Sequence, residues 1–166
     1  MNKLRHRFSI LVFFLVAAIP VRAQSPDTGV LSAPELINAR ALLRASQESI
    51  IREDLRLTAE EEGAFWPLYQ EYRADLLPNQ DRYVELIAGY MRQYQSGVLT
   101  DDYAEDMLDG YFDIKADILR TRKKYISQFG KILPMRKVAR FYQLENKMNA
   151  DVDAELALLV PLFEAN

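Results

Sequence analysis

Residues 57–67 read LTAEEEGAFWP, and this stretch decides how the chain is organised. Thr58 is followed three residues later by Glu61, the spacing of a capping box, in which each side chain binds a free backbone N–H of the first helical turn. Three consecutive glutamates at 60–62 then lie at the positive end of the helix dipole, where negative charge is favourable. The stretch predicts a helix that begins at Thr58.

Two prolines, Pro67 and Pro78, lie in what should be the interior of this helix. A proline there removes a backbone hydrogen bond and clashes with the preceding turn, which costs about 3 kcal/mol. The two are 11 residues apart, about three turns, so they share a face and bend the helix in one direction. Apolar residues continue at helical spacing from Phe65 to Tyr94, and Gly97 ends the pattern. We expect one long bowed helix; the alternative is that either proline separates two shorter helices.

The rest of the chain shows helical spacing and no strand alternation. Helices are predicted over roughly 34–56, from Thr100 to the region of Gly130 and Pro134, and from Pro134 to Pro161. Thr100 is the expected cap of the third helix. The inward-facing stripe of this helix is predicted to be Tyr103, Met107, Gly110, Ile114, Ile118, Thr121, Tyr125, Phe129 and Ile132. The fold class is therefore all-α, with about four helices in long bent hairpins. Because so thin a chain leaves apolar stripes half covered, we also expect a homodimer.

The first 23 residues have the pattern of an export signal. A basic start is followed by an unbroken apolar run over 10–19, too short to cross a bilayer of about 30 Å, and then by Val21-Arg22-Ala23. We expect cleavage after Ala23 and a periplasmic product, with an uncleaved membrane anchor as the alternative. Residues 24–33 read as a flexible arm and 34–162 as a single helical domain.

Composition narrows the chemistry of the predicted mature chain. The sequence contains no cysteine, and its one histidine, His6, lies in the predicted signal peptide. We therefore expect no nucleophile system that uses histidine, and we do not expect most kinds of zinc, copper or nickel site. The methionines fall mostly on core stripes, and the adjacent carboxylates compensate helix dipoles. With no phosphate-binding or hydrolase motif present, we predict no enzyme, no cofactor and no metal site.

The charge distribution is uneven. Removing the predicted signal peptide leaves 17 basic and 24 acidic residues, yet residues 120–140 contain eight cations and no acid. The tentative polypeptide-binding residues are these cations with two interleaved aromatics: Arg120, Arg122, Lys123, Lys124, Lys131, Arg136, Lys137, Arg140, Tyr125 and Phe129. Positive charge at the start of the fourth helix opposes the helix dipole, so binding or internal pairing, with Glu145 as one candidate partner, must offset it. Nucleic acid is not an expected partner of an exported protein.

Leu57-Thr58-Ala59-Glu60-Glu61 resembles the LTxxQ signature of the CpxP/Spy family of periplasmic stress proteins, with Glu61 in place of the usual Gln. Leu99-Thr100 matches the first two positions of a second copy, and Tyr103 departs from it. The segments FWPLYQEYRADL and LPMRKVARFYQLENKM look like those of other exported bacterial proteins with this fold. The resemblance covers roughly residues 33–159. It implies a cradle-shaped antiparallel dimer of bent helices in the periplasm.

Three functions follow as hypotheses. The first is an ATP-independent, chaperone-like envelope-stress protein, in which basic residues steer unfolded polypeptides and aromatics hold them weakly. The alternative is a regulatory adaptor that binds the periplasmic domain of a membrane sensor. A plain interaction module without chaperone activity is a third possibility, and the sequence does not separate the three.

Overall fold

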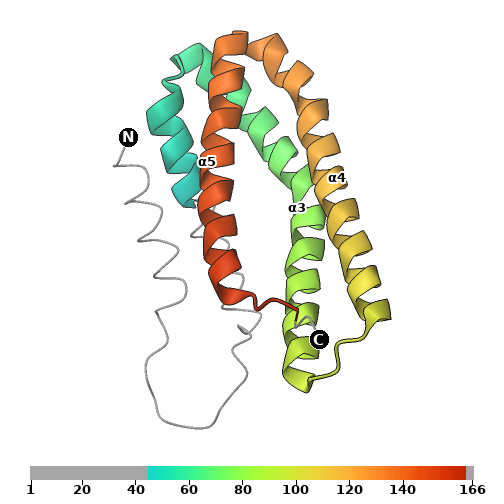
Figure 1. The fold of residues 1–166 in the computed structure, drawn as a ribbon. Helices are drawn as coiled ribbons and strands as arrows, with labels where there is room; N and C mark the ends of the chain where they lie inside the picture. The colour runs from blue at the N-terminus through green and yellow to red at the C-terminus, as the bar shows by residue number, and fades with distance from the viewer. Residues whose placement is uncertain (1–44, 164–166) are drawn as a thin grey trace. The chain divides into compact units, whose positions relative to one another are not determined.

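The computed structural model describes residues 45–163, apart from the side chains of residues 155 and 159, and this part of the chain is all-α (Figure 1). A helical segment over 45–55 is followed by α3 (Ala59–Ser96), α4 (Asp101–Ile132) and α5 (Met135–Leu159). No strand occurs between residues 45 and 163, which confirms the predicted fold class. The predicted signal peptide at 1–23, the arm at 24–33 and the first part of the 34–56 helix lie outside the described residues.

The described chain groups into two compact units. The first contains residues 45–56 and 140–159, and the second contains residues 57–139 and 160–163. The long helices α3 and α4 therefore both belong to the second unit. The prediction of a single helical domain over 34–162 stays a prediction.

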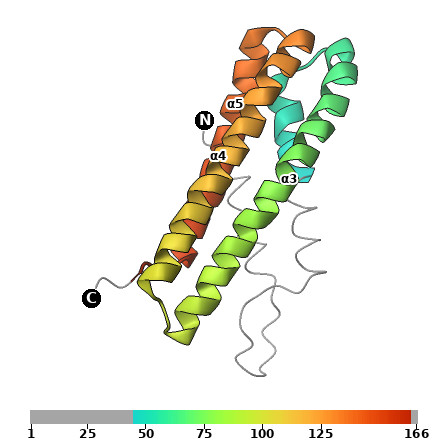
Figure 2. The ribbon, with the colours of Figure 1, turned by 90° about the vertical axis from the view of Figure 1, so that its right-hand side faces the viewer.

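The second unit is built on an antiparallel hairpin of α3 and α4, which run side by side in Figure 2. Its core is aromatic. The rings of Phe65 and Phe129 lie 5.5 Å apart, and those of Tyr72 and Tyr125 lie 5.1 Å apart, centroid to centroid. All four side chains are buried, as is that of Tyr69. Each such ring stabilises the hairpin through buried apolar area and through its contacts with neighbouring rings, the latter by about 0.5–1.5 kcal/mol per pair.

The caps predicted from the sequence are present. The Thr58 hydroxyl accepts from the backbone N–H of Glu61 at 3.2 Å, and the Glu61 carboxylate accepts from the backbone N–H of Thr58 at 2.8 Å. Thr100 accepts from the N–H of Tyr103 at 3.2 Å. Gly97 ends α3 at a φ of 70°, a left-handed conformation that favours glycine. These local signals thus place both ends of α3 and the start of α4.

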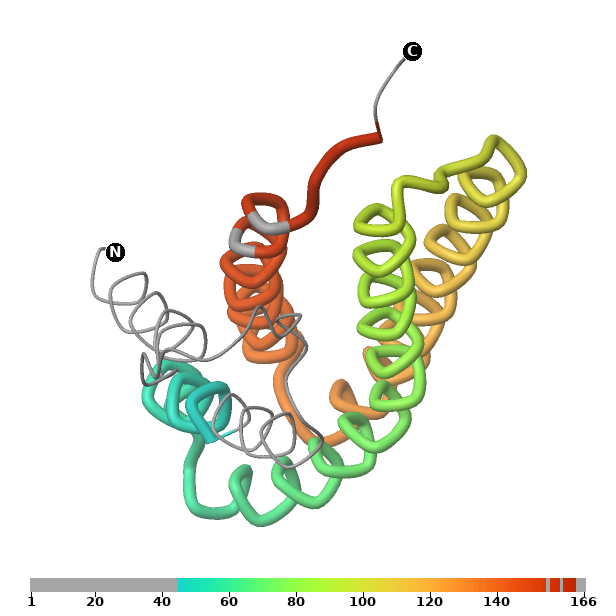
Figure 3. The backbone as a smooth tube through the Cα atoms, turned by 90° about the horizontal axis from the view of Figure 1, so that it is seen from below, coloured from blue at the N-terminus to red at the C-terminus, as the bar shows by residue number. Residues whose placement is uncertain are grey.

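α3 is one continuous helix of 38 residues that contains both Pro67 and Pro78, as predicted. Both prolines are exposed, and so are Gly63 and Ala74, whose carbonyls lose their helical donors to them. Water can reach these carbonyls, which lowers the cost of the two interruptions. The helix follows an arc rather than a straight line (Figures 1 and 3), in agreement with the predicted bow.

α4 ends at Ile132, between Gly130 and Pro134, the two residues predicted to mark its end. Pro134 stops the helix, because the residue before a proline is forced out of the helical region. Leu133 is accordingly extended, with φ −131° and ψ 148°, and it is buried. The carbonyl of Pro134 accepts from the N–H groups of Lys137 and Val138 and so starts α5. α5 ends before Pro161, as predicted.

In the first unit, the segment 45–55 and α5 each bury apolar side chains. Ile50, Ile51 and Leu55 are buried in the segment, and Phe141, Leu144 and Met148 are buried in α5. The segment ends at Arg56, which has a φ of 48°. The buried positions of α5 recur at three- and four-residue steps, the spacing expected for one covered face of a helix.

Candidate polypeptide-binding surface

Half of the predicted basic cluster is held in ion pairs with carboxylates of the same chain. The four pairs are Arg120–Asp117, Lys124–Asp75, Lys137–Glu61 and Arg140–Asp54. Arg122 is half-buried and also makes contacts within the protein. Internal pairing, rather than solvation alone, therefore accounts for much of this cationic stretch.

Asp75 joins the two helices of the hairpin. Its Oδ2 accepts hydrogen bonds from the Lys124 ammonium and from the Tyr125 hydroxyl, each at 2.8 Å. The bond from Lys124, followed by that from Tyr125, holds the pKa of Asp75 below its ordinary value. Burial, together with the negative charge of Asp75, raises the pKa of Tyr125 to about 12. The tyrosine is therefore a neutral hydrogen-bond donor at physiological pH.

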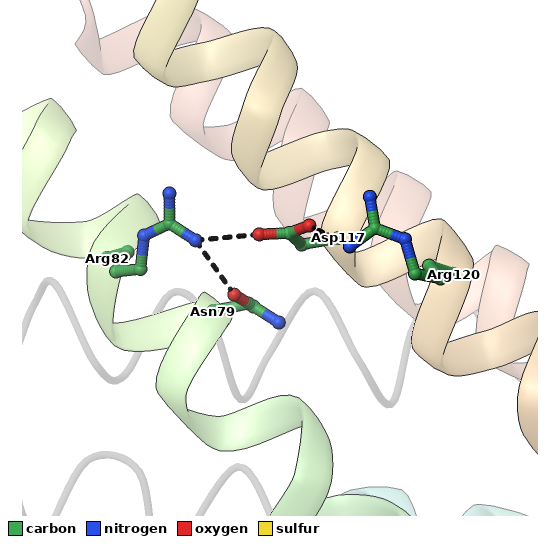
Figure 4. A network of polar contacts seen from close by, with 4 residues as sticks. All are labelled: Asn79, Arg82, Asp117 and Arg120. Atoms are coloured by element: carbon green, nitrogen blue, oxygen red, sulfur yellow. Dashed lines mark hydrogen bonds and ion pairs between the residues drawn. The ribbon is translucent and has the colours of Figure 1, made fainter.

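A second network lies on the same hairpin (Figure 4). Arg82 of α3 donates to Asn79 at 3.1 Å and to Asp117 of α4 at 2.9 Å, and Arg120 donates to the other oxygen of Asp117 at 2.6 Å. The hydrogen bond from Arg82 is the main reason that the pKa of Asp117 lies below its ordinary value. Arg120 is thus bound to a carboxylate one turn away on its own helix, and it is less available to a partner.

The cations at the start of α5 offset the helix dipole through internal contacts. The Lys137 ammonium donates to the carboxylate of Glu61 in the capping box of α3, and this bond lowers the pKa of Glu61. Arg140 donates to the backbone carbonyl of Asp54 at 2.7 Å, in the last turn of the segment 45–55. That carbonyl has no donor within the helix, and a cation there is favoured by the dipole. The pairing predicted for Glu145, which is buried, stays a prediction.

Tyr125 and Phe129 do not belong to a binding surface, which corrects the sequence-based assignment. Their exposed fractions are 3% and 0%, and their rings pack in the α3–α4 core. The sequence contained the signal for this, because both positions also fall on the predicted inward stripe of the helix. A side chain on that stripe cannot contact an unfolded polypeptide without the hairpin opening.

Three of the predicted cations are exposed and make no ion pair with the side chains that the structure describes: Lys123, Lys131 and Arg136. Lys131 lies in the last turn of α4 and Arg136 in the first turn of α5. Between them is Met135, which is 57% exposed and which sequence reasoning had not assigned to the surface. Lys131, Met135 and Arg136 are called the turn surface below.

The turn surface is held by the geometry of its own backbone. The Leu133 N–H donates to the Phe129 carbonyl at 2.9 Å, and the buried Leu133 side chain anchors the connection. The Met135 sulfur lies 3.1 Å from the position that a Cβ on Gly130 would take, so the glycine leaves room for the methionine. The turn thus carries a flexible apolar side chain with an exposed cation on either side of it in the sequence, and such residues suit weak and adaptable polypeptide contacts.

No group of three or more metal-ligating side chains occurs among residues 45–163 whose side chains are described. In the same part of the chain, no helix has both the length and the apolar character needed to cross a membrane.

The comparisons with known proteins identify no relative: no family model, curated protein or solved structure matches this chain.

Proposed function

We propose that this is an exported, ATP-independent chaperone-like protein that binds unfolded polypeptides weakly at the turn surface. The observation that carries the proposal is the arrangement of Lys131, Met135 and Arg136. These side chains are exposed, the two cations lack ion pairs among the described residues, and all three lie at the turn between α4 and α5.

The energetics of this surface suit transient binding. Exposed cations attract acidic segments over a range of about 10 Å at moderate salt, which accelerates encounter more than it strengthens the complex. Met135 adds an apolar contact that adapts to many sequences. We therefore expect broad specificity and modest affinity. A chaperone without an energy source needs a modest affinity, because it must release its client spontaneously. The proposal includes no catalytic step and no cofactor.

The test is suppression of aggregation of a chemically denatured client, followed by light scattering, with the mature protein from residue 24. We expect suppression that grows with the protein-to-client ratio and weakens between low and high salt. The double variant Lys131→Glu, Arg136→Glu should lose most of it. A matched control is Arg92→Glu, which reverses one exposed charge near the far end of α3. Unimpaired suppression by the double variant would show that the turn surface is not the binding site.

The same assay separates the adaptor hypothesis. A protein that suppresses no aggregation at several-fold excess, but that retains one stoichiometric membrane-sensor partner in a pull-down from envelope extracts, is an adaptor. Export is tested by cell fractionation of the tagged precursor. We expect a product shortened by 23 residues in the periplasmic fraction, and full-length protein in the cytoplasm would contradict the proposal.

A further inference from the structure

Residues 160–163, called the strap below, lie against the α3–α4 hairpin near the connection between its two helices. They follow α5 without helical structure (Figure 1), and they group with the hairpin in the second unit. The Tyr90 hydroxyl of α3 donates to the Pro161 carbonyl at 2.8 Å. The rings of Tyr90 and Phe163 lie 5.0 Å apart, centroid to centroid. A hydrogen bond and a ring contact thus join the strap to the hairpin.

The strap presents alternate residues to the hairpin. Pro161 and Phe163 are half-buried, whereas Leu162 between them is 86% exposed. Successive side chains of an extended segment point to opposite sides, so this alternation is the one expected of an extended segment that lies along a surface. The contact uses a backbone carbonyl and an aromatic ring two residues later, and it leaves the Leu162 side chain in solvent.

Tyr90 belongs to a group of three tyrosines contributed by both helices. The ring of Tyr94, one turn further along α3, lies 6.0 Å from that of Tyr90. Tyr103 of α4 reaches α3 at Gly89, where a Cβ would lie 3.9 Å from its hydroxyl oxygen. Tyr90 is buried, and burial, followed by the proximity of the Tyr94 and Tyr103 hydroxyls, raises its pKa. Its hydroxyl is therefore a neutral donor at physiological pH. Tyr90, Tyr94 and Tyr103 are called the tyrosine cluster below.

The tyrosine cluster has the chemistry by which aromatic surfaces recognise extended peptides that contain proline. Such surfaces receive apolar side chains on their rings, and a proline segment costs little to order because its φ is already fixed. The strap meets these requirements with Pro161 and Phe163. Neither requirement is particular to this chain, because any extended segment with a proline followed two positions later by an aromatic residue carries the same two groups.

We propose that the tyrosine cluster is a docking site for an extended segment of another polypeptide, with a proline followed two positions later by an aromatic residue, and that the strap covers this site in cis. The strap belongs to the same chain as the cluster, so it competes at a high effective concentration. A partner segment binds the molecules whose strap is released, and its apparent affinity is reduced to that fraction. Weakening the strap should therefore strengthen docking.

The proposal does not depend on the proposed function. Tyr103 lies 28 residues before Lys131 on α4, which corresponds to about 42 Å along the helix. A peptide of four residues spans at most about 14 Å, so it cannot contact the tyrosine cluster and the turn surface together. Lys131→Glu, Arg136→Glu should bind such a peptide as the wild type does. In the wild-type chain the strap keeps the cluster covered while a client binds at the turn surface.

The first experiment is fluorescence anisotropy of a labelled peptide, Val-Pro-Leu-Phe with both ends blocked, titrated with the mature protein. Phe163→Ala should bind the peptide at least severalfold more tightly than the wild type, because the strap is weakened. Leu162→Ala, at the exposed position of the same strap, is the matched control and should bind as the wild type does. A peptide with serine in place of the phenylalanine should bind weakly. Equal binding by the wild type and Phe163→Ala, or binding by neither, overturns the proposal.

A second variant locates the docked peptide. In the Phe163→Ala chain, Tyr90→Phe should weaken peptide binding severalfold, because the hydroxyl that donates to the proline carbonyl is then absent. Tyr111→Phe, eight residues beyond Tyr103 on α4, is the matched control and should leave binding unchanged. Circular dichroism checks that each variant keeps its helical content. Peptide binding that survives Tyr90→Phe at full strength would lie elsewhere and would reject the tyrosine cluster as the site.

Nitration with tetranitromethane, followed by mass spectrometry, tests whether the strap covers Tyr90. The rate of modification at Tyr90 should rise in Phe163→Ala, stay unchanged in Leu162→Ala, and fall again when the peptide is added to Phe163→Ala. A rate that is the same in all three proteins contradicts a cover that can be released. A dimeric wild type that becomes monomeric in Phe163→Ala would assign the cluster to the strap of a second copy and reject a foreign segment.

Discussion

Replacing Asp75 with alanine removes the carboxylate that accepts hydrogen bonds from both Lys124 and Tyr125. The two lost bonds differ in their surroundings. The Lys124 side chain is 59% exposed and that of Asp75 is 42% exposed, so this ion pair contributes at most about 1 kcal/mol. Tyr125 as a residue is 3% exposed, and its hydroxyl would be left in the hairpin without this acceptor. A buried donor that loses its partner costs about 1–3 kcal/mol.

We therefore expect Asp75→Ala to lower the free energy of unfolding by about 2 kcal/mol, mostly through Tyr125. Lys124→Ala should cost less than about 1 kcal/mol. Tyr125→Phe in the Asp75→Ala background should cost little more, because the unpaired hydroxyl is then absent.

The measurement is urea unfolding followed by circular dichroism for the wild type, the single variants and the double variant. A second readout is tyrosinate absorbance during alkaline titration. Removing the charge of Asp75 should lower the pKa of Tyr125, although burial, its larger cause, keeps the value above 10. Equal losses in Lys124→Ala and Asp75→Ala, or strict additivity of Asp75→Ala and Tyr125→Phe, would refute this account of the hairpin.

Further predictions concern one buried ring, one turn and the pH dependence. Phe129→Ala should destabilise the protein by about 3–5 kcal/mol in the same unfolding assay, because the ring is fully buried; a loss under 1 kcal/mol would mean that the core collapses around the gap. Gly97→Ala should lower the melting temperature, since alanine is strained at a φ of 70°, and an unchanged melting temperature would contradict the left-handed cap. Glu61, Asp75 and Asp117 have pKa values below 4.5, 3.8 and 3.8 in the fold. The stability that these three carboxylates contribute is fully present above their ordinary pKa values. It is lost as the pH falls through their lowered pKa values in the fold, so we expect the melting temperature to decrease once the pH is below about 4.5. A melting temperature that is constant from pH 6 to pH 3 would show that these pairs contribute nothing.

Features that depend on a few neighbouring residues could be predicted from the sequence. The capping box of Thr58 and Glu61 spans three residues, and Gly97 acts through its own backbone angle. The continuity of α3 through Pro67 and Pro78 was also predictable, because apolar spacing persisted across both prolines. The end of α4 at Ile132 was predictable as well, because Gly130 and Pro134 lie on either side of it and a proline forces the residue before it out of the helix.

Contacts between distant segments could not be predicted in this way. Lys137 and Glu61 are 76 residues apart, and Lys124 and Asp75 are 49 apart, so each pair depends on how the helices align. The sequence indicated that positive charge at the start of α5 is unfavourable, but it did not indicate which groups would pair with Lys137 and Arg140.

The central claim is that the turn surface touches unfolded polypeptide. Since the sequence has no cysteine, Met135→Cys can carry a single fluorophore, with Ser96→Cys at the far end of α3 as the matched control. Titration with a permanently unfolded, carboxymethylated polypeptide should produce a saturable change in emission at position 135 that weakens with salt, and little change at position 96. An unchanged signal at 135, or equal changes at both positions, would contradict the claim.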